Sequence, residues 1–219
     1  MKFLILLFLA IVLGSSCRPT TQSENPLAER EEEVWREVFA AEERGHWEKV
    51  DYGNPEMVGW EGERLRLEMG AELIGAKWTG ELPQAPYELE FAARRMNGSD
   101  FFGALTFPLR RDDELVTLVL GGWGGGVVGI SSIDGKDAAE NETTTYLAFE
   151  KEKWYRVRLR VEVNSLRAWI DEALVVELSL DGREFSLRPG PIELCAPLGV
   201  AAWQTGAELR GLRWRPLAD

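Results

Sequence analysis

The segment 155–163 alternates apolar and charged side chains with a period of two. Its odd-numbered positions hold Tyr, Val, Leu, Val and Val, and its even-numbered positions hold Arg, Arg, Arg and Glu. Successive side chains of a strand point to opposite faces, so this pattern predicts a β-strand with one buried and one solvated face. A chain that contains such a strand needs a sheet and a partner layer to cover the apolar side.

Six further strand-like segments lie between residue 46 and the C-terminus, with no helical pattern between them. Asn97-Gly98, Asp181-Gly182 and Pro189-Gly190-Pro191 supply turn residues. The succession predicts an all-β domain over residues 46–219, a jelly-roll sandwich of two antiparallel sheets. Residues 116–120 are nearly continuous in apolar character, which indicates a central strand covered on both faces. The predicted strands are residues 64–69, 87–93, 115–120, 166–171, 174–180 and 209–214.

Residues 1–16 have the pattern of an export signal. Met1 and Lys2 are followed by eleven apolar residues, too few to span a bilayer as a helix, and then by small residues. Cys17 follows directly, as in a bacterial lipoprotein lipobox, although Gly14 stands where such sequences usually have Leu. The sequence predicts an exported protein anchored to the membrane in the periplasm or envelope by a lipid on Cys17. The alternative is an incidental cysteine beside an ordinary signal-peptidase site in a secreted protein.

Residues 17–45 are expected to form a polar tether and one short amphipathic helix. Asn25-Pro26 is a helix-start signal, and Gly45 is a stop. Apolar residues recur between them at helical spacing, at positions 27, 34, 35, 38 and 39.

Charge and composition exclude several classes of function. The net charge of −12 argues against binding nucleic acid or anionic lipid, which needs clustered Lys and Arg. His46 is the one histidine, and Cys17 and Cys195 are the two cysteines, so a Cys/His zinc site and a disulfide framework are poorly supported. If Cys17 carries a lipid, Cys195 is a buried or free thiol.

A glycine-rich stretch begins at Gly121, with six glycines in nine residues around Trp123. It lacks the Gly-Lys-Ser/Thr of a phosphate loop. Glycine at these positions allows tight turns or close backbone approach, and Trp123 is then presented for stacking on a sugar face. With nine Trp in the chain, a structural role for Trp123 is the alternative.

Acidic residues are candidates for chemistry in three places. The loop 134–142 concentrates oxygen ligands that can bind a hard cation such as Ca²⁺ or sugar hydroxyls, without the spacing of an EF-hand; a solvated loop is the alternative. Glu88 and Glu90 share one face of a strand, as a catalytic pair or as solubilising charges. Asp100, at a strand mouth, is placed to act as a base.

Short motifs are spread over residues 47–217: Trp78-Thr79-Gly80, Tyr87-Glu88-Leu89-Glu90-Phe91, Asp100-Phe101-Phe102, Leu105-Thr106-Phe107-Pro108, Gly121-Gly122-Trp123-Gly124-Gly125, Ser131-Ser132-Ile133-Asp134-Gly135, Glu140-Asn141-Glu142-Thr143, Trp154-Tyr155, Ala168-Trp169-Ile170-Asp171, Pro197-Leu198-Gly199-Val200-Ala201 and Trp203-Gln204-Thr205. In order and density they resemble the 3-keto-disaccharide hydrolase domain, a family of exported proteins of planctomycetes and related bacteria. The resemblance implies a concanavalin A-like jelly roll that hydrolyses the glycosidic bond of 3-keto-glycosides.

A 3-keto group acidifies the proton on C2 and permits elimination across C1–C2 followed by hydration. One positioned base, with one group that polarises the ketone, then suffices. The candidate bases are Asp100, Asp134 and Asp137. Asn141, Gln204 or a bound divalent cation such as Ca²⁺ is expected to stabilise the enolate.

The expected ligand in every functional interpretation is a carbohydrate. Trp123 and Trp203 are predicted to stack on it, and Asn141, Glu142 and Gln204 to contact it. The competing hypothesis is a non-catalytic carbohydrate-binding or surface-interaction module of the same fold. A third is a purely structural envelope protein.

Overall fold

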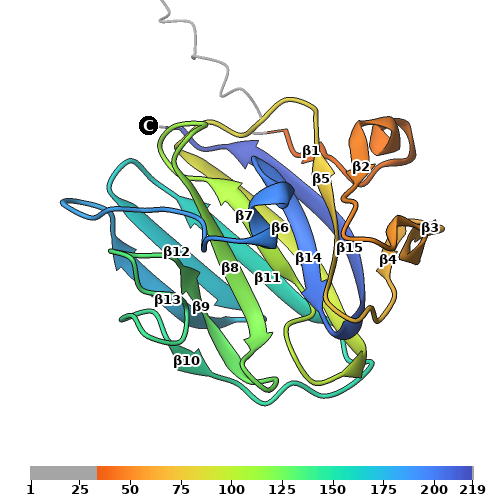
Figure 1. The fold of residues 1–219 in the computed structure, drawn as a ribbon. Helices are drawn as coiled ribbons and strands as arrows, with labels where there is room; N and C mark the ends of the chain where they lie inside the picture. Colours follow the sequence, from red (N-terminus) through yellow and green to blue (C-terminus); the bar gives the residue numbers. More distant parts are fainter. Residues whose placement is uncertain (1–33, 219) are drawn as a thin grey trace, which may run out of the picture. The chain divides into compact units, whose positions relative to one another are not determined.

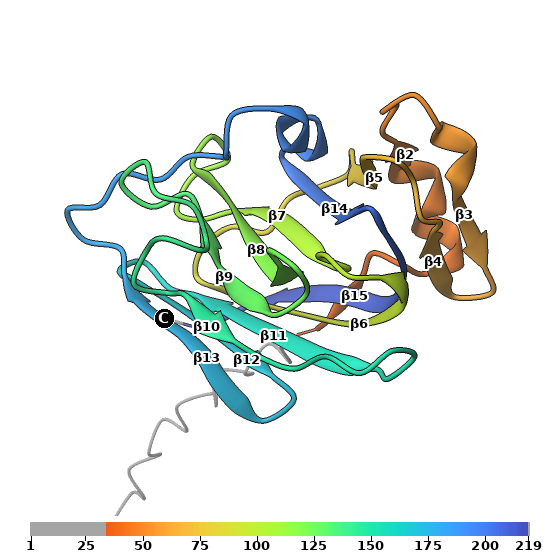
Figure 2. The same cartoon turned by 60° about the horizontal axis from the view of Figure 1, so that its bottom comes forward.

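The computed structural model describes residues 34–218. Within them the chain forms two antiparallel sheets, of eight and seven strands, packed face to face (Figure 1). The predicted all-β jelly-roll sandwich is therefore confirmed. Figure 2 shows the two sheets as separate layers, with the chain between the last hairpin and β14 running over the outer side of the seven-stranded sheet.

The eight-stranded sheet has the order β13-β12-β11-β6-β15-β4-β3, with β1 also paired to β15. Its strands are β1 (Arg36–Glu37), β3 (Val58–Glu61), β4 (Arg64–Leu67), β6 (Tyr87–Gly98), β11 (Tyr155–Val161), β12 (Ser165–Ile170), β13 (Ala173–Ser179) and β15 (Thr205–Pro216).

The seven-stranded sheet has the order β10-β9-β8-β7-β14-β5-β2. Its strands are β2 (Trp47–Lys49), β5 (Leu73–Trp78), β7 (Ala104–Pro108), β8 (Leu115–Gly122), β9 (Val127–Ser131), β10 (Thr145–Tyr146) and β14 (Leu198–Trp203). Short 3₁₀ turns complete the fold: η1 (Ala41–His46), η2 (Pro55–Met57) and η3 (Pro191–Cys195).

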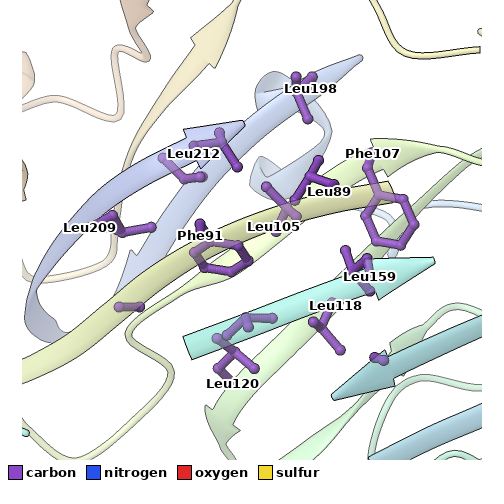
Figure 3. Packing of buried hydrophobic residues seen from close by; sticks show 14 of the residues in the cluster. Leu89, Phe91, Leu105, Phe107, Leu118, Leu120, Leu159, Leu198, Leu209 and Leu212 are labelled. Atoms are coloured by element: carbon purple, nitrogen blue, oxygen red, sulfur yellow. The ribbon is translucent and has the colours of Figure 1, made fainter. Parts of the chain in front are cut away.

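The core lies between the sheets, where the apolar faces of their strands meet (Figure 3). The eight-stranded sheet contributes Leu89, Phe91 and Leu159, and the seven-stranded sheet contributes Phe107 and Leu120, all no more than 2% exposed. The alternating pattern at 155–161 accounts for the contribution of β11 to the core: Tyr155, Val157 and Leu159 point inward, and the arginines between them point outward.

The strand predicted for residues 116–120 is confirmed as a central strand. It lies in β8, between β7 and β9, and every one of its residues is buried. All seven predicted strands occur in the structure, with ends shifted by a few residues.

The predicted amphipathic helix is wrong for residues 34–40, whereas Ala41–His46 forms the 3₁₀ turn η1, and the part before residue 34 lies outside the described residues. Arg36–Glu37 forms β1, and the backbone N–H groups of Val38 and Phe39 donate to the carbonyl of Leu212 on β15. Tertiary contacts override the helical pattern here, because β15 pairs with this part of the backbone and Val38 and Phe39 are buried against the core. The predicted signal, the tether and Cys17 lie outside the described residues. No helix among the described residues is long and apolar enough to cross a membrane.

Candidate functional site

A pocket of about 420 Å³ lies on the outer face of the seven-stranded sheet. Because Leu118 and Leu120 of β8 enter the core, the alternate residues Thr117 and Val119 face outward and line the pocket floor. The other floor residues come from four neighbouring strands of the same sheet: Leu73, Ala104, Ser131 and Trp203.

Three loops form the walls of this pocket, and most of the surface that lines it is apolar. The segment after β6 supplies Asp100 and Phe101, the turn after β8 supplies Trp123, and residues 188–192 supply the third wall. The small and hydroxyl-bearing floor residues leave open volume, and the Thr117 hydroxyl is already hydrogen-bonded to Thr106, 2.9 Å away.

The third wall is fixed by η3, which packs on the outer face of β5 and β14. Cys195 is fully buried there, with its Sγ 3.2 Å from the hydroxyl of Tyr52. Burial raises the pKa of Cys195 to about 11. The sequence-based expectation of a buried thiol is confirmed, and this thiol has a packing role rather than a place in the pocket lining.

Asp100 is the one carboxylate among the described residues that line the pocket. Its Oδ1 accepts from the N–H of Phe101 at 2.8 Å, and its Oδ2 accepts from the N–H of Gly124 at 3.2 Å. Its own N–H donates to Oγ1 of Thr205. These bonds tie the predicted base to the glycine-rich turn that carries Trp123.

Trp123 is 43% exposed and stands at a tight turn with a φ of 47°. The guanidinium carbon of Arg188 lies 5.7 Å from the centre of its ring. Arg188 is the one cation among the described lining residues, and its ion pair with Asp137 is long, at 3.8 Å. Asp137 thus reaches the pocket only through Arg188. No sequence pattern had singled out Arg188.

The glycine-rich stretch does permit close backbone approach, as the sequence indicates. A Cβ on Gly121 would lie 2.4 Å from Nη2 of Arg95, and one on Gly125 would lie 3.3 Å from Nη1. The buried Arg95 therefore occupies the space that side chains at these two positions would need.

The loop 134–142 is organised by its own contacts. Asp134 and Glu142 both form ion pairs with Arg183, and neither lines the pocket. A hydrogen bond from the N–H of Glu184, assisted by Arg183, lowers the pKa of Asp134. The buried Asn141 donates to the carbonyls of Ile130, Lys136 and Asp137 and accepts from Thr143.

These contacts bear on the predicted cation. Asp134 and Glu142 face a guanidinium, and no group of three or more His, Cys, Asp or Glu within residues 34–218 is arranged to hold a metal ion. Asp134 and Glu142 are therefore already paired with a cationic side chain of the protein itself.

Trp203 and Gln204 are neighbours in sequence with different positions. Trp203, the last residue of β14, lines the pocket. Gln204 adopts a φ of 44° and its Nε2 donates to the carbonyl of Ala71 at 2.8 Å. The structure thus brings Asp100, Trp123 and Trp203 together, and Asp137 indirectly, whereas Gln204 fixes the corner between β14 and β15.

Glu88 and Glu90 lie on the outer face of the other sheet. Glu88 accepts from Arg158 and Arg215, and Glu90 accepts from Arg156 and Arg213. Each carboxylate is buried between guanidiniums of neighbouring strands, so these residues are cross-strand charge partners in the arrangement observed.

The fold and the position of the pocket define the class: a jelly-roll β-sandwich of two antiparallel sheets with a pocket on the outer face of one of them. No family model and no curated protein matches the sequence. Solved structures do match. The exoplasmic/lumenal domain of VIP36, in a Ca²⁺/Man-bound form, has a TM-score of 0.56 at 8% identity, over 80% of this chain and 84% of that one.

Two further matches are enzymes by name. The Crh5 transglycosylase in complex with NAG has a TM-score of 0.54 at 11% identity, covering 85% of this chain and 84% of that one. A native glycosidic hydrolase has a TM-score of 0.54 at 7% identity, covering 83% and 94%. At these identities the similarity establishes the fold.

Proposed function

We propose that this protein acts on glycans and hydrolyses the glycosidic bond of 3-keto-glycosides in the pocket of the seven-stranded sheet. The observation that carries the proposal is the lone carboxylate of Asp100 beside the exposed ring of Trp123, in a pocket whose lining is mostly apolar and whose one cation is Arg188. Aromatic and apolar walls with few polar groups are typical of a small-ligand site. Structures of the same fold are named as a glycosidic hydrolase, a transglycosylase and a mannose-bound domain.

The single carboxylate favours elimination over the usual glycosidase mechanisms. Retaining and inverting glycosidases need two carboxyls at a fixed separation across the bond. A 3-keto-glycoside needs one base. Asp100 removes the proton from C2, Arg188 faces the enolate oxygen, and the C1–O bond breaks as the leaving oxygen takes the proton back from Asp100. Water then adds across the C1=C2 bond, its oxygen at C1 and a proton at C2, to give the free 3-keto sugar.

The test is to incubate residues 18–219 with 3-keto-trehalose or methyl 3-keto-β-glucoside and follow the free 3-keto sugar by NMR. In D₂O, elimination followed by hydration introduces deuterium at C2 of the product above the rate without protein. Parallel samples with EDTA and with added Ca²⁺ measure the dependence on a divalent cation. Asp134→Asn is the matched control for Asp100→Asn, since Asp134 lies outside the pocket lining.

The second candidate is a non-catalytic carbohydrate-binding module, which the apolar lining and the two Trp side chains favour. Ligand binding that saturates while no 3-keto sugar is released would support it. Neither binding nor release, from protein whose circular dichroism shows folded sheets, would leave the structural envelope role.

We also propose that the protein is exported and lipid-anchored through Cys17. Expression of the full chain in a bacterial host with a radiolabelled fatty acid measures this directly. Label in the wild type that is lost in Cys17→Ala supports the anchor, and equal label in both overturns it.

A further inference from the structure

Arg95 lies behind the pocket wall, at the point where β6 approaches the glycine-rich turn. The residue is 6% exposed. Its Nη2 donates to three backbone carbonyls, those of Asp100 at 3.1 Å, Gly121 at 3.3 Å and Gly125 at 2.8 Å. One side chain therefore connects the loop of the proposed base with both ends of the turn that carries Trp123.

This guanidinium has no carboxylate within ion-pair distance among residues 34–218, and the carboxylate that acts on it from farther away is that of Asp100. The rings of Phe102 and Phe149 flank it, with centroids 4.9 and 5.9 Å from its Cζ. Its Nε is buried without a hydrogen-bond partner among the same residues. Burial of a charge without an ion-pair partner is costly, which argues for a role beyond local packing.

The turn is shaped to receive this side chain. Gly121 has a φ of +77° and Gly125 a φ of +111°, and a Cβ at either position would press on the guanidinium. The close approach of backbone to guanidinium is what these glycines permit.

We infer that Arg95 is a positioning residue, which fixes Asp100 and the turn that carries Trp123 relative to each other through the backbone carbonyls of Asp100, Gly121 and Gly125. The inference rests on the proposed function for its effect on activity, because Asp100 and Trp123 are the residues proposed to act on the sugar. The effect of Arg95 on the structure of the pocket does not depend on the proposed function, so the structural and the catalytic effects are measured separately.

The structural effect is measured by ¹⁹F NMR on protein labelled with 5-fluorotryptophan. The Trp123 resonance is the one missing from a Trp123→Phe sample. In Arg95→Met this resonance is expected to shift or broaden, while that of Trp78, assigned in the same way and fully buried in the core, stays in place. Arg95→Lys keeps the charge and three donors and is expected to restore the wild-type position in part.

The effect on catalysis is measured as kcat and KM for the 3-keto-glycoside. A displacement of about 1 Å in a catalytic group costs on the order of 100-fold in rate. Arg95→Met is expected to lose about that in kcat/KM, with most of the loss in kcat, and Arg95→Lys to recover at least part of it.

Gly121→Ala provides an independent way to displace Arg95, with Gly182→Ala as its matched control. Gly182 has a similar φ, +70°, but nothing lies within 4 Å of the added Cβ. Gly121→Ala should change the Trp123 resonance in the same way as Arg95→Met does, and Gly182→Ala should leave this resonance at the wild-type position. The double variant Arg95→Met/Gly121→Ala should be no worse than either single variant, since both act on one contact.

An unchanged Trp123 resonance in folded Arg95→Met overturns the inference. If Arg95→Met does not fold, the Trp123 resonance is measured in Arg95→Lys and Gly121→Ala instead, and an unchanged resonance in both overturns the inference. A wild-type protein without turnover or sugar binding overturns the proposed function while the resonance still tests Arg95.

Discussion

The outer face of the eight-stranded sheet carries charge, whereas the outer face of the seven-stranded sheet carries the pocket. On the first, Glu88, Glu90 and Glu208 are at most 8% exposed, and each accepts hydrogen bonds from two arginines of neighbouring strands. On the second, the outward residues are small, hydroxylic or apolar, and Asp100 stands as one carboxylate among them.

The difference shows how one strand geometry produces a surface or a site. Where long Arg and Glu side chains alternate across strands, they satisfy one another, and the hollow of about 830 Å³ on that face is lined by paired charges such as Glu90, Arg156 and Arg213. Where Ala104, Thr117 and Ser131 point outward, the space stays open, and residues 188–192 wall it. Asp100 and Arg188 border this open volume, where a ligand that enters it can contact them.

The largest effect that separates the faces is expected from Asp100→Asn. Loss of the proposed base should lower kcat by about 10²–10⁴-fold, the usual contribution of a general base. Turnover of 3-keto-trehalose, followed by NMR, measures the loss.

Glu90→Gln on the opposite face is its control and should turn over substrate at the wild-type rate. Asp100→Asn that keeps more than about a tenth of the wild-type rate would contradict a role as base, given the same range of effects.

The next effect concerns stability and belongs to the charged face. Glu208→Ala leaves Arg64 and Arg94 facing each other without the carboxylate that both contact at 3.0 Å or less. Removing one partner of a buried charge cluster is expected to cost about 3 kcal/mol of unfolding free energy. Urea denaturation at pH 7 measures this loss.

The matched control is Glu177→Ala, which removes an exposed Glu–Arg pair on the same sheet. It should change the unfolding free energy by less than about 1 kcal/mol. Equal losses in the two variants would show that the outer face is not organised by its buried carboxylates.

The sequence predicts the two sheets unequally, for a physical reason. Strands with one solvated face show a period of two, as β11 does. The strands β5, β7, β9 and β14 are covered on both sides, so their sequences show no alternation, and they contain Gly and Ala that are weak strand signals. The period-two pattern therefore does not predict these four strands.

The candidate site divides in the same way. Asp100, Trp123 and Trp203 were recognisable by residue type and by their position beside turns, and they line the pocket. Asp134 and Glu142 were equally plausible by residue type, but Arg183, more than 40 residues away along the chain, forms ion pairs with both. A partner that distant leaves no local pattern in the sequence.

A smaller effect is expected at the aromatic wall of the pocket. Trp123→Ala removes the exposed ring and should weaken sugar binding about tenfold, which corresponds to about 1.4 kcal/mol, within the range of aromatic contacts. Titration by isothermal calorimetry measures the dissociation constant, and Trp123→Phe should lie between the wild type and Trp123→Ala.

Trp154→Ala is the control on the charged face, where Trp154 lies between the guanidiniums of Arg94 and Arg210. Its loss should leave the dissociation constant unchanged. If Trp154→Ala weakens binding and Trp123→Ala does not, the ligand binds the face opposite to the proposed pocket.

The smallest effect is a pH dependence of stability that comes from the charged face. Burial opposes ionisation of Glu90, but hydrogen bonds from Arg213 and Arg156 outweigh it and lower the pKa below the ordinary value of 4.5. A carboxyl with a lowered folded-state pKa stabilises the fold above its unfolded-state pKa, and this stability is lost as pH falls through the folded-state value. Wild type should therefore exceed Glu90→Gln in unfolding free energy at pH 7, by about 1 kcal/mol for such hydrogen-bonded charges. The difference in unfolding free energy should narrow below pH 4.5 and close once Glu90 is protonated in the folded state, because Gln does not titrate.

Urea denaturation of both proteins between pH 7 and pH 3 measures this difference. Glu177→Gln is the exposed control, and its difference from the wild type should be near zero throughout. A gap that stays constant across this range would mean that packing of Glu90, and not its charge, stabilises this face.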